Sequence, residues 1–349
     1  MEYLHIFKNT NAKFSDPYIE FINEHFDSNK HQFILLGKKN NSQKHPSKNV
    51  RDYLGNSLIS LVLLNRYMYK SKQIFLHGLF IPHIILLLFI QPWLIKKSYW
   101  LIWGEDLYYY KNRKNGIKSS VYELVRKFVI RHLGGLVTHI KGDYELAKSW
   151  YGAKGKYFYS FMYPSNLFND YNLSKIEKDK PMFIQVGNSA SSNNEHIEIF
   201  EKLAKYKNKD IKIICPLSYG DTEYRRKVIK DGSRIFGEKF LPITEFLPLE
   251  EYLELLGKID IAIFNHKRQQ AMGNITTLLG LGKKVYIRDD ITTWDFCIQH
   301  GLKVYNSNND FENLFEVIPI TEKTNNVERI MKQFSINKLK TDWNTIFKE

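Results

Sequence analysis

Short apolar runs alternate with amphipathic segments along the whole chain. The runs are bounded by Gly, Pro or polar residues and predict buried strands. They lie at residues 3–7, 32–37, 73–78, 99–103, 135–140, 182–186, 211–215, 259–264 and 284–287. Apolar positions at helical spacing predict helices at 15–25, 56–69, 119–133, 143–150, 195–206, 221–231, 249–257, 273–281 and 327–348. Alternation of this kind predicts parallel sheets covered by helices on both faces.

A polar stretch at residues 165–181, with Pro164 and Pro181 at its flanks, interrupts this rhythm and predicts a linker. At 349 residues the chain is also long for a single core. We therefore expect an α/β protein with two Rossmann-like lobes whose parallel sheets face each other across a cleft. The first lobe would span 1–165, rejoined by a C-terminal helix at 335–349, and the second would span 175–334.

The densest apolar run, residues 84–95, predicts either a buried helix or one inserted into a membrane surface. A bilayer span needs about 20 apolar residues, and this run is shorter and contains Gln91 and Pro92. The first ten residues lack the basic start and long apolar region of a signal peptide. The two cysteines, Cys215 and Cys297, form no disulfide framework or metal signature. We expect a protein that stays in a reducing cytosol.

Positive charge is concentrated in the first half of the chain. Residues 1–172 hold 24 Lys and Arg against 12 Asp and Glu, whereas residues 173–349 hold 27 against 25. A basic half indicates an anionic partner, such as phospholipid, a lipid-linked diphosphate or nucleic acid. The helix expected at 119–133 carries Arg126, Lys127 and Arg131 beside its apolar positions, which suits either an anionic membrane surface or plain solvent. No recognised nucleic-acid motif is present, so we expect no nucleic-acid partner.

The loop after the strand at 182–186 is a candidate phosphate site. A strand, a loop of small residues and a helix N-terminus together favour an anion, because free backbone N–H groups and the helix dipole point at it. Either Asn193 or Asn194 is expected to cap the helix. An ordinary polar turn is the alternative. The candidate donor-binding residues here are Gly187, Asn188, Ser189, Asn194, Glu195 and His196.

A second loop of this kind follows the strand at 259–264. Arg268 beside a helix N-terminus can bind a diphosphate, and the amides of Gln269 and Gln270 suit sugar hydroxyls. Gly273 and Asn274 open the helix. No Asp-x-Asp motif stands in a suitable loop, so we expect neither a metal ion nor a cofactor. Two aromatic residues, Tyr219 and Phe246, are candidates to border the nucleoside, although either could belong to the core.

Three residues of the first half are candidate catalytic groups. Glu105 and Asp106 follow one buried strand, and His77 ends another. Charged side chains at the carboxyl end of a buried strand face a cleft more often than a core. A carboxylate there can act as general base toward a sugar hydroxyl. We take Asp106 as the first candidate, Glu105 as its competitor and His77 as the next.

Four motifs together resemble one known family. They are His77-Gly-Leu-Phe-Ile-Pro82, Trp103-Gly-Glu-Asp-Leu-Tyr108, Val186-Gly-Asn-Ser189 with Asn194-Glu-His196, and Arg268-Gln-Gln270 with Gly273. In this order, from about residue 75 to residue 296, they resemble the TDP-N-acetylfucosamine:lipid II N-acetylfucosaminyltransferases, glycosyltransferase family 56. The resemblance implies a GT-B fold, a dTDP-linked 4-amino-4,6-dideoxyhexose donor and an undecaprenyl-diphosphate-linked acceptor. It also implies a peripheral enzyme at the cytoplasmic face of the inner membrane.

Three other functions stay open. A GT-B enzyme could use another donor, such as a UDP-HexNAc, in capsule or O-antigen assembly. The net charge of +14 also fits a basic nucleic-acid-binding protein. A protein that binds nucleotide sugars without catalysis would carry the same donor loops. Filter binding to nucleic acid and a turnover assay separate the last two from a transferase.

Overall fold

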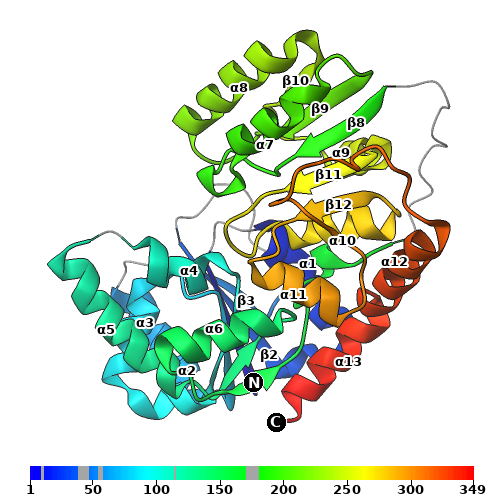
Figure 1. Cartoon of the computed structure of the whole chain (residues 1–349). Helices are drawn as coiled ribbons and strands as arrows, with labels where there is room; N and C mark the ends of the chain where they lie inside the picture. The colour runs from blue at the N-terminus through cyan, green and yellow to red at the C-terminus, as the bar shows by residue number, and fades with distance from the viewer. Residues whose placement is uncertain (9–11, 38–46, 54–57, 114, 170–180) are drawn as a thin grey trace. The chain divides into compact units, whose positions relative to one another are not determined.

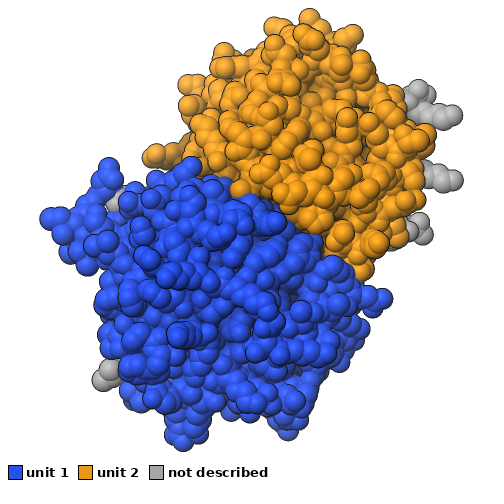
Figure 2. Space-filling view, turned by 60° about the horizontal axis from the view of Figure 1, so that its bottom comes forward, with its two compact units in different colours: residues 1–167, 336–349 blue, residues 168–335 orange. Residues whose placement is uncertain are grey.

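The computed structural model describes residues 1–8, 12–37, 47–53, 58–113, 115–169 and 181–349. It divides the chain into two compact units, residues 1–167 with 336–349, and residues 168–335 (Figure 2). Figure 1 traces the alternation of strands and helices in both. Most of the stretch expected to be a linker, residues 170–180, lies outside the described part.

Unit 1 contains a seven-stranded parallel sheet in the order β3-β2-β1-β4-β5-β6-β7. Its strands are β1 (Tyr3–Lys8), β2 (His31–Leu36), β3 (Val50–Tyr53), β4 (Gln73–His77), β5 (Ser98–Leu101), β6 (Gly135–Val137) and β7 (Lys156–Phe158). Its helices are α1 (Ala12–His25), α2 (Leu58–Lys70), α3 (Pro82–Ile90), α4 (Glu105–Asn112), α5 (Ile117–His132), α6 (Lys141–Tyr151) and α13 (Ile336–Phe347). Short 3₁₀ turns are η1 (Ser28–Lys30), η2 (Pro92–Lys97) and η3 (Pro164–Asn166).

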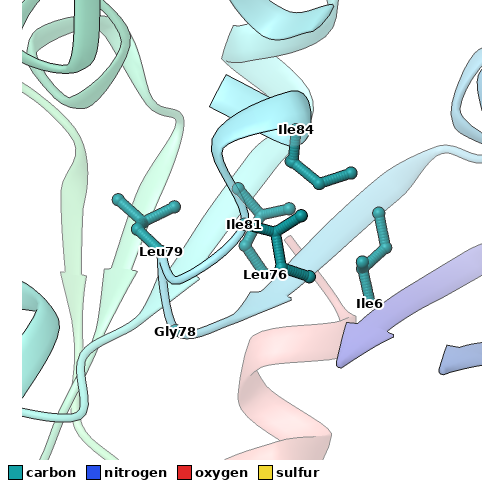
Figure 3. A pocket seen from close by; sticks show the side chains of 6 residues that line it. All are labelled: Ile6, Leu76, Gly78, Leu79, Ile81 and Ile84. Carbon is teal, nitrogen blue, oxygen red and sulfur yellow. The ribbon is translucent and has the colours of Figure 1, made fainter. Parts of the chain in front are cut away.

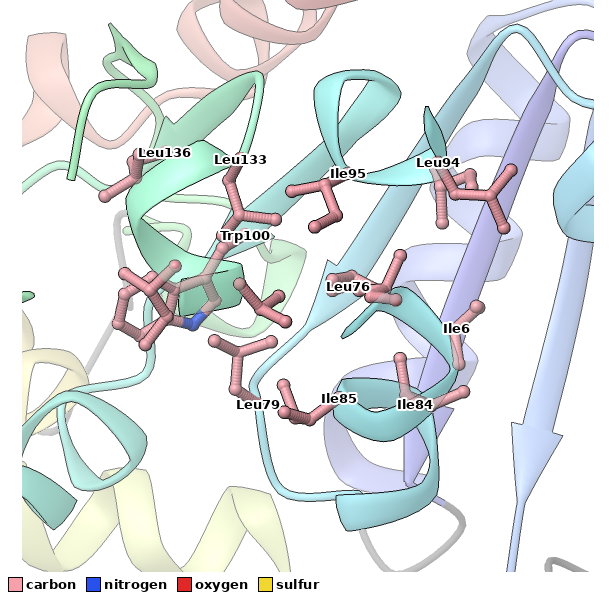
Figure 4. Packing of buried hydrophobic residues seen from close by; sticks show 14 of the residues in the cluster. Ile6, Leu76, Leu79, Ile84, Ile85, Leu94, Ile95, Trp100, Leu133 and Leu136 are labelled. Carbon is pink, nitrogen blue, oxygen red and sulfur yellow. The ribbon is translucent and has the colours of Figure 1, made fainter. Parts of the chain in front are cut away.

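The two faces of this sheet have different cores because successive strand residues point to opposite sides. Leu4 and Ile6 of β1 lie in an aliphatic cluster with α2, α3, α5 and α6 (Figure 4). Trp100 is the largest side chain of that cluster and is completely buried. His5 of β1 lies on the other face, where it stacks on Phe75 and meets Trp343 of α13 edge-on.

Unit 2 contains a six-stranded parallel sheet in the order β10-β9-β8-β11-β12-β13. Its strands are β8 (Met182–Val186), β9 (Ile211–Pro216), β10 (Phe240–Ile243), β11 (Ile261–Phe264), β12 (Lys284–Ile287) and β13 (Tyr305–Asn306). Its helices are α7 (His196–Leu203), α8 (Thr222–Phe236), α9 (Leu249–Lys258), α10 (Met272–Gly280), α11 (Thr292–Gln299) and α12 (Ile320–Gln333). Its 3₁₀ turns are η4 (Ser192–Asn194), η5 (Ala204–Tyr206) and η6 (Gly237–Lys239).

Both sheets reverse their strand order at one place, between β1 and β4 in unit 1 and between β8 and β11 in unit 2. From this point, consecutive crossovers run in opposite directions, so the loops at the carboxyl ends of the two strands diverge and leave room for a ligand. In unit 2, these loops are residues 187–195 and 265–271. In unit 1, β4 ends here at His77, and residues 9–11 after β1 lie outside the described part.

Two sequence predictions about helices are wrong. The apolar run at 84–95, expected to be one helix that is either buried or inserted into a membrane surface, is not a single helix: α3 ends at Ile90, and η2 follows. Pro92 lacks an N–H and moves the preceding residue out of the helical region, so Gln91 has φ −120° and ψ 69°. The single helix expected at 327–348 is likewise two helices, α12 and α13, separated at Phe334 and Ser335. None of the described helices is both long and apolar enough to cross a bilayer.

Candidate functional site

In unit 2 the loops that follow β8, β9 and β11 meet through one network of polar side chains. Asn188 lies at its centre: its Nδ2 donates to the Tyr219 hydroxyl at 2.8 Å, and its Oδ1 accepts from Gln270 Nε2 at 3.1 Å. His266 Nε2 lies 3.0 Å from Asn188 Oδ1 and 2.9 Å from Asn194 Oδ1. Both oxygens are acceptors, so His266 carries its proton on Nε2. Side chains from all three loops therefore hold one another in place.

Asn194 closes the first loop on itself and does not cap the helix, which corrects the sequence prediction. Its Oδ1 also accepts from the backbone N–H of Asn188 at 2.9 Å, and its Nδ2 donates to the Ser191 carbonyl at 3.1 Å. Glu195 takes the cap position instead, with a left-handed φ of 49° and no capping side-chain bond. The loop thereby stays tight against the end of β8.

Gly187 is required where the loop leaves β8. Its φ is 68°, and a Cβ there would lie 2.4 Å from His196 Nε2 and 2.7 Å from Asn194 Oδ1. Both contacts are far below van der Waals distance, so a larger residue would displace the network. His196 and His266 are fully buried, and burial lowers the pKa of each imidazole to about 3. Both rings are consequently neutral at physiological pH.

Three polar atoms in or beside this network lack a hydrogen-bond partner among the described residues. They are His196 Nε2, His266 Nδ1 and Gln270 Oε1, and all three atoms are buried. An unpaired buried polar atom costs about 1–3 kcal/mol, so native proteins rarely keep one without a reason. Atoms of this kind beside a strand-order reversal mark a place where a polar ligand or ordered water can bind.

The second loop adds a cation and a helix N-terminus. Arg268 is partly exposed, and its Nη1 donates to the Gln269 carbonyl at 3.0 Å. Ala271 precedes α10 with a left-handed φ of 59°, and no side chain caps the helix. The first N–H groups of a helix have no partner within it, so those of α10 can bind an anion. Gly273 and Asn274 belong to this first turn.

One of the candidate donor-binding residues, Phe246, is not joined to the polar network, and one residue of the network, His266, was not among the candidates. Phe246 has 74% of its surface exposed, and no polar contact among the described residues joins it to the network. His266 was missed as a site residue, although a histidine two positions beyond a buried strand and beside Arg268 is a recognisable signal. Glu195 is held at the edge of the network by an ion pair of 2.8 Å with Lys267.

In unit 1, the two sequence motifs of the first half meet at Asp106. Its Oδ2 accepts from the Leu79 N–H at 2.8 Å and from Trp100 Nε1 at 2.6 Å. Its Oδ1 accepts from the N–H groups of Trp103 at 3.0 Å and Leu107 at 2.9 Å. The carboxylate is therefore filled by four donors and joins the loop after β4 to the loop after β5.

This environment does not suit a general base. Asp106 is 3% exposed, and burial raises the pKa of its carboxyl while the hydrogen bonds from Leu79 and Trp100 oppose the rise. Arg126, expected to face a membrane or solvent, is instead 1% exposed and donates to the Asp106 carbonyl and the Tyr151 hydroxyl. Glu105, the first residue of α4, is the exposed carboxylate of the pair.

His77 lies inside a chain of hydrogen-bonded side chains on the buried face of the sheet. Its Nδ1 is 2.8 Å from the Tyr163 hydroxyl, which also accepts from Trp103 Nε1 at 2.8 Å. On its other side lie His5 at 3.3 Å and then His31, 3.0 Å from His5. Burial lowers the pKa of His77 well below its usual value. His77 is thus a core residue with satisfied partners.

The turn after His77 lies beside a small apolar cavity (Figure 3). It is lined by Ile6, Leu76, Gly78, Leu79, Ile81 and Ile84 and has a volume of about 10 Å³. This is roughly the space that one water molecule requires. The cavity is therefore too small for a sugar.

The chain is similar in fold to several solved structures. Sucrose-phosphate synthase from Thermosynechococcus elongatus matches with a TM-score of 0.73 at 10% identity, covering 100% of this chain and 98% of that one. A UDP-forming alpha,alpha-trehalose-phosphate synthase from Burkholderia vietnamiensis matches with 0.68 at 7% identity, covering 99% and 98%. The E. coli trehalose-6-phosphate structure bound with UDP-2-fluoro glucose matches with 0.68 at 10% identity, covering 100% and 99%. These likenesses confirm the predicted GT-B fold.

The family is decided by the sequence model that the chain matches. That model describes the 4-alpha-L-fucosyltransferases of glycosyl transferase group 56, and it matches residues 4–349. This range extends beyond the motifs at 75–296 and takes in both units. The chain therefore belongs to glycosyl transferase group 56 and is a glycosyltransferase.

Proposed function

We propose that this glycosyltransferase moves a 4-amino-4,6-dideoxyhexose from a dTDP-sugar to an undecaprenyl-diphosphate-linked saccharide. The product would serve the synthesis of a surface polysaccharide, such as an O-antigen, a capsule or a common antigen. The identity of both substrates rests on the resemblance to the lipid II N-acetylfucosaminyltransferases. The proposed location is the cytoplasmic face of the inner membrane, where the enzyme would be peripheral.

The observation that carries the donor site is the network at the strand-order reversal of unit 2. Asn188 comes from the loop after β8, and His266 and Gln270 come from the loop after β11. His266 and Gln270 each keep one buried polar atom without a partner among the described residues, beside the N-terminus of α10. A nucleotide sugar needs an anion site for its diphosphate and polar groups for its hydroxyls, and this edge supplies both. The E. coli structure named above carries UDP-2-fluoro glucose, which supports a nucleotide-sugar ligand for this fold.

Arg268 is proposed to bind the donor diphosphate. Replacing Arg268 with Ala should weaken the binding of the nucleotide sugar by about 1.5–3 kcal/mol, the worth of a hydrogen bond to a charged group. Isothermal titration calorimetry with a dTDP-sugar measures this directly. Arg234→Ala is a matched control, because Arg234 is exposed in the last turn of α8, far along that helix from the loop at its start. Unchanged affinity in Arg268→Ala would remove Arg268 from the site.

The charge of the departing diphosphate is proposed to be neutralised by Arg268 and the first N–H groups of α10, without a metal ion. Turnover should then be the same in EDTA as in Mg²⁺. The check is an initial-rate assay after chelation, followed by titration with Mg²⁺ and Mn²⁺. Activity that is lost in EDTA and restored by either ion would contradict this proposal.

A UDP-HexNAc donor is the competing assignment. The two assignments are separated by measuring the thermal unfolding midpoint in parallel titrations with dTDP- and UDP-linked sugars. A ligand present at 100 times its dissociation constant raises the free energy of unfolding by about 2.7 kcal/mol, so the donor that binds more tightly gives the larger shift at equal concentration. We expect the larger thermal shift with the dTDP-sugar. A shift confined to UDP-sugars would favour the other donor class while leaving the transferase assignment intact.

A further inference from the structure

Large apolar side chains are exposed mainly on one part of unit 1. Among the described residues, 21 large hydrophobic side chains are exposed, and 12 of them belong to α2, α3, η2 and α5. They include Ile59 of α2, Ile90 of α3 and Leu124 of α5, with 73%, 62% and 69% of their surfaces exposed. Scattered apolar residues are normal on a protein surface, but a concentration of this kind indicates an interaction site.

These residues form one surface, which we call the α2–α3–α5 face. On α5 they recur at intervals of three or four residues, at Ile117, Val121, Leu124 and Phe128, so they lie along one side of that helix. The elements also contact each other. The rings of Phe89 and Phe128 are 5.3 Å apart and join α3 to α5, and a 2.8 Å hydrogen bond from Gln91 to Asn65 joins the end of α3 to α2. Figure 1 shows α3 and α5 side by side in unit 1.

The charge on this face has one sign. Exposed basic side chains stand beside the apolar ones at Arg66, Lys70, Lys96, Lys118, Lys127 and Arg131. The single carboxylate within α2, α3, η2 and α5 is Glu123, which is buried 3.9 Å from Arg126. A second copy of the chain would place like charges opposite each other, whereas an anionic lipid surface complements both the cations and the apolar residues.

We propose that the α2–α3–α5 face inserts its apolar side chains into the interface of an anionic bilayer, with its lysines and arginines at the lipid phosphates. This inference deepens the proposed function and rests on it for the lipid-linked acceptor. Electrostatic attraction through residues 111–131 alone would fade as salt rises. An inserted apolar face retains much of its binding in high salt, because hydrophobic burial is not screened.

Trp93 provides a direct probe of insertion. It is 57% exposed, and the other five tryptophans of the chain are buried or intermediate. The full chain is mixed with vesicles of phosphatidylethanolamine and phosphatidylglycerol that carry bromine on their acyl chains. We expect the emission of Trp93 to shift to the blue and to be quenched, and Trp93→Tyr to lose the quenching. Binding without quenching in the native chain would overturn insertion.

The second arm uses variants that leave the core unchanged. Ile90→Ser with Leu124→Ser should lower the partition coefficient on these vesicles by about tenfold or more, because two apolar side chains no longer leave water. The matched control is Ile298→Ser with Val317→Ser, two residues of unit 2 that are 55% and 91% exposed. Equal partitioning of all three proteins would overturn the proposal.

Binding of the dTDP-sugar is measured on the same variants, because the proposed donor residues lie in unit 2. Variants that bind the donor normally but no longer bind vesicles would support insertion of the α2–α3–α5 face and would be consistent with a donor site in unit 2. Vesicle binding that is unchanged by the Ile90 and Leu124 substitutions would contradict insertion of the α2–α3–α5 face. It would leave the assignment as a glycosyltransferase unaffected. Capture of an acidic protein in place of vesicles would likewise overturn the lipid assignment.

Discussion

Replacing Glu105 with Gln is expected to lower turnover by about 10²–10⁴-fold, the usual contribution of a positioned general base. Glu105 is the exposed carboxylate of the Trp103–Tyr108 motif, and Gln keeps its size while removing its ability to accept a proton. Donor binding should stay unchanged, since the proposed donor residues belong to unit 2. Initial rates at saturating donor, together with calorimetry of donor binding, separate the two effects. Near-normal turnover would remove Glu105 as the base.

The variant Asp106→Asn tests whether Glu105, and not Asp106, is the general base. Four donors fill the Asp106 carboxylate, so the amide nitrogen of Asn would face at least one donor it cannot accept from. Each buried donor left unsatisfied costs about 1–3 kcal/mol. We therefore expect a lower thermal midpoint in Asp106→Asn, with activity lost through the fold. A variant with native stability and strongly reduced turnover would restore Asp106 as the base.

Mild acid is expected to destabilise both units. Burial lowers the pKa of His31 to about 4 and those of His196 and His266 to about 3, and it lowers those of His5 and His77 well below the usual value. An unfolded imidazole has a pKa near 6.5, so below that pH the unfolded chain binds more protons and stability falls as pH falls. At pH 5.5 each such histidine removes about 1.4 kcal/mol relative to pH 8.

Urea unfolding of the full chain between pH 8 and pH 5.5 measures this dependence. His266→Asn should reduce the number of protons taken up on unfolding by about one, and so reduce the slope of the unfolding free energy with pH, because one buried imidazole is removed. Stability that is constant or rises toward pH 5.5 would contradict the neutral, buried state of these rings.

Much of the fold could be predicted from the alternation of short apolar runs with amphipathic segments. The runs at 3–7, 73–78, 182–186 and 259–264 correspond to the central strands of the two sheets. Peripheral elements were missed because their signal is short: β13 has two residues and β7 has three. The break in the run at 84–95 could be predicted from Pro92, because a proline moves the residue before it, here Gln91, out of the helical region. The sequence left open whether α3 is buried or lies at a surface, because a uniformly apolar helix has no polar side to mark its exposed face.

The site was predictable at the level of loops and less so at the level of atoms. Asn188 and Gln270 were each singled out because they follow a buried strand, and the structure joins them by a hydrogen bond at the carboxyl ends of neighbouring strands. That rule cannot tell which of two consecutive carboxylates turns inward, and Glu105 and Asp106 differ because the donors of Leu79 and Trp100 come from other segments. Long-range partners likewise made Arg126 a core residue on a helix whose pattern suggested an exposed cation.

The most direct test of the donor and acceptor assignment is mass spectrometry of the lipid acceptor after incubation with the full chain. The reaction contains a dTDP-linked 4-amino-4,6-dideoxyhexose and an undecaprenyl-diphosphate-linked saccharide, with a UDP-HexNAc in a parallel reaction. The account predicts that the acceptor gains one dideoxyhexose, that one dTDP is released for each, and that Arg268→Ala slows both. Transfer from the UDP-sugar alone, or binding of the dTDP-sugar without any transfer, would contradict it.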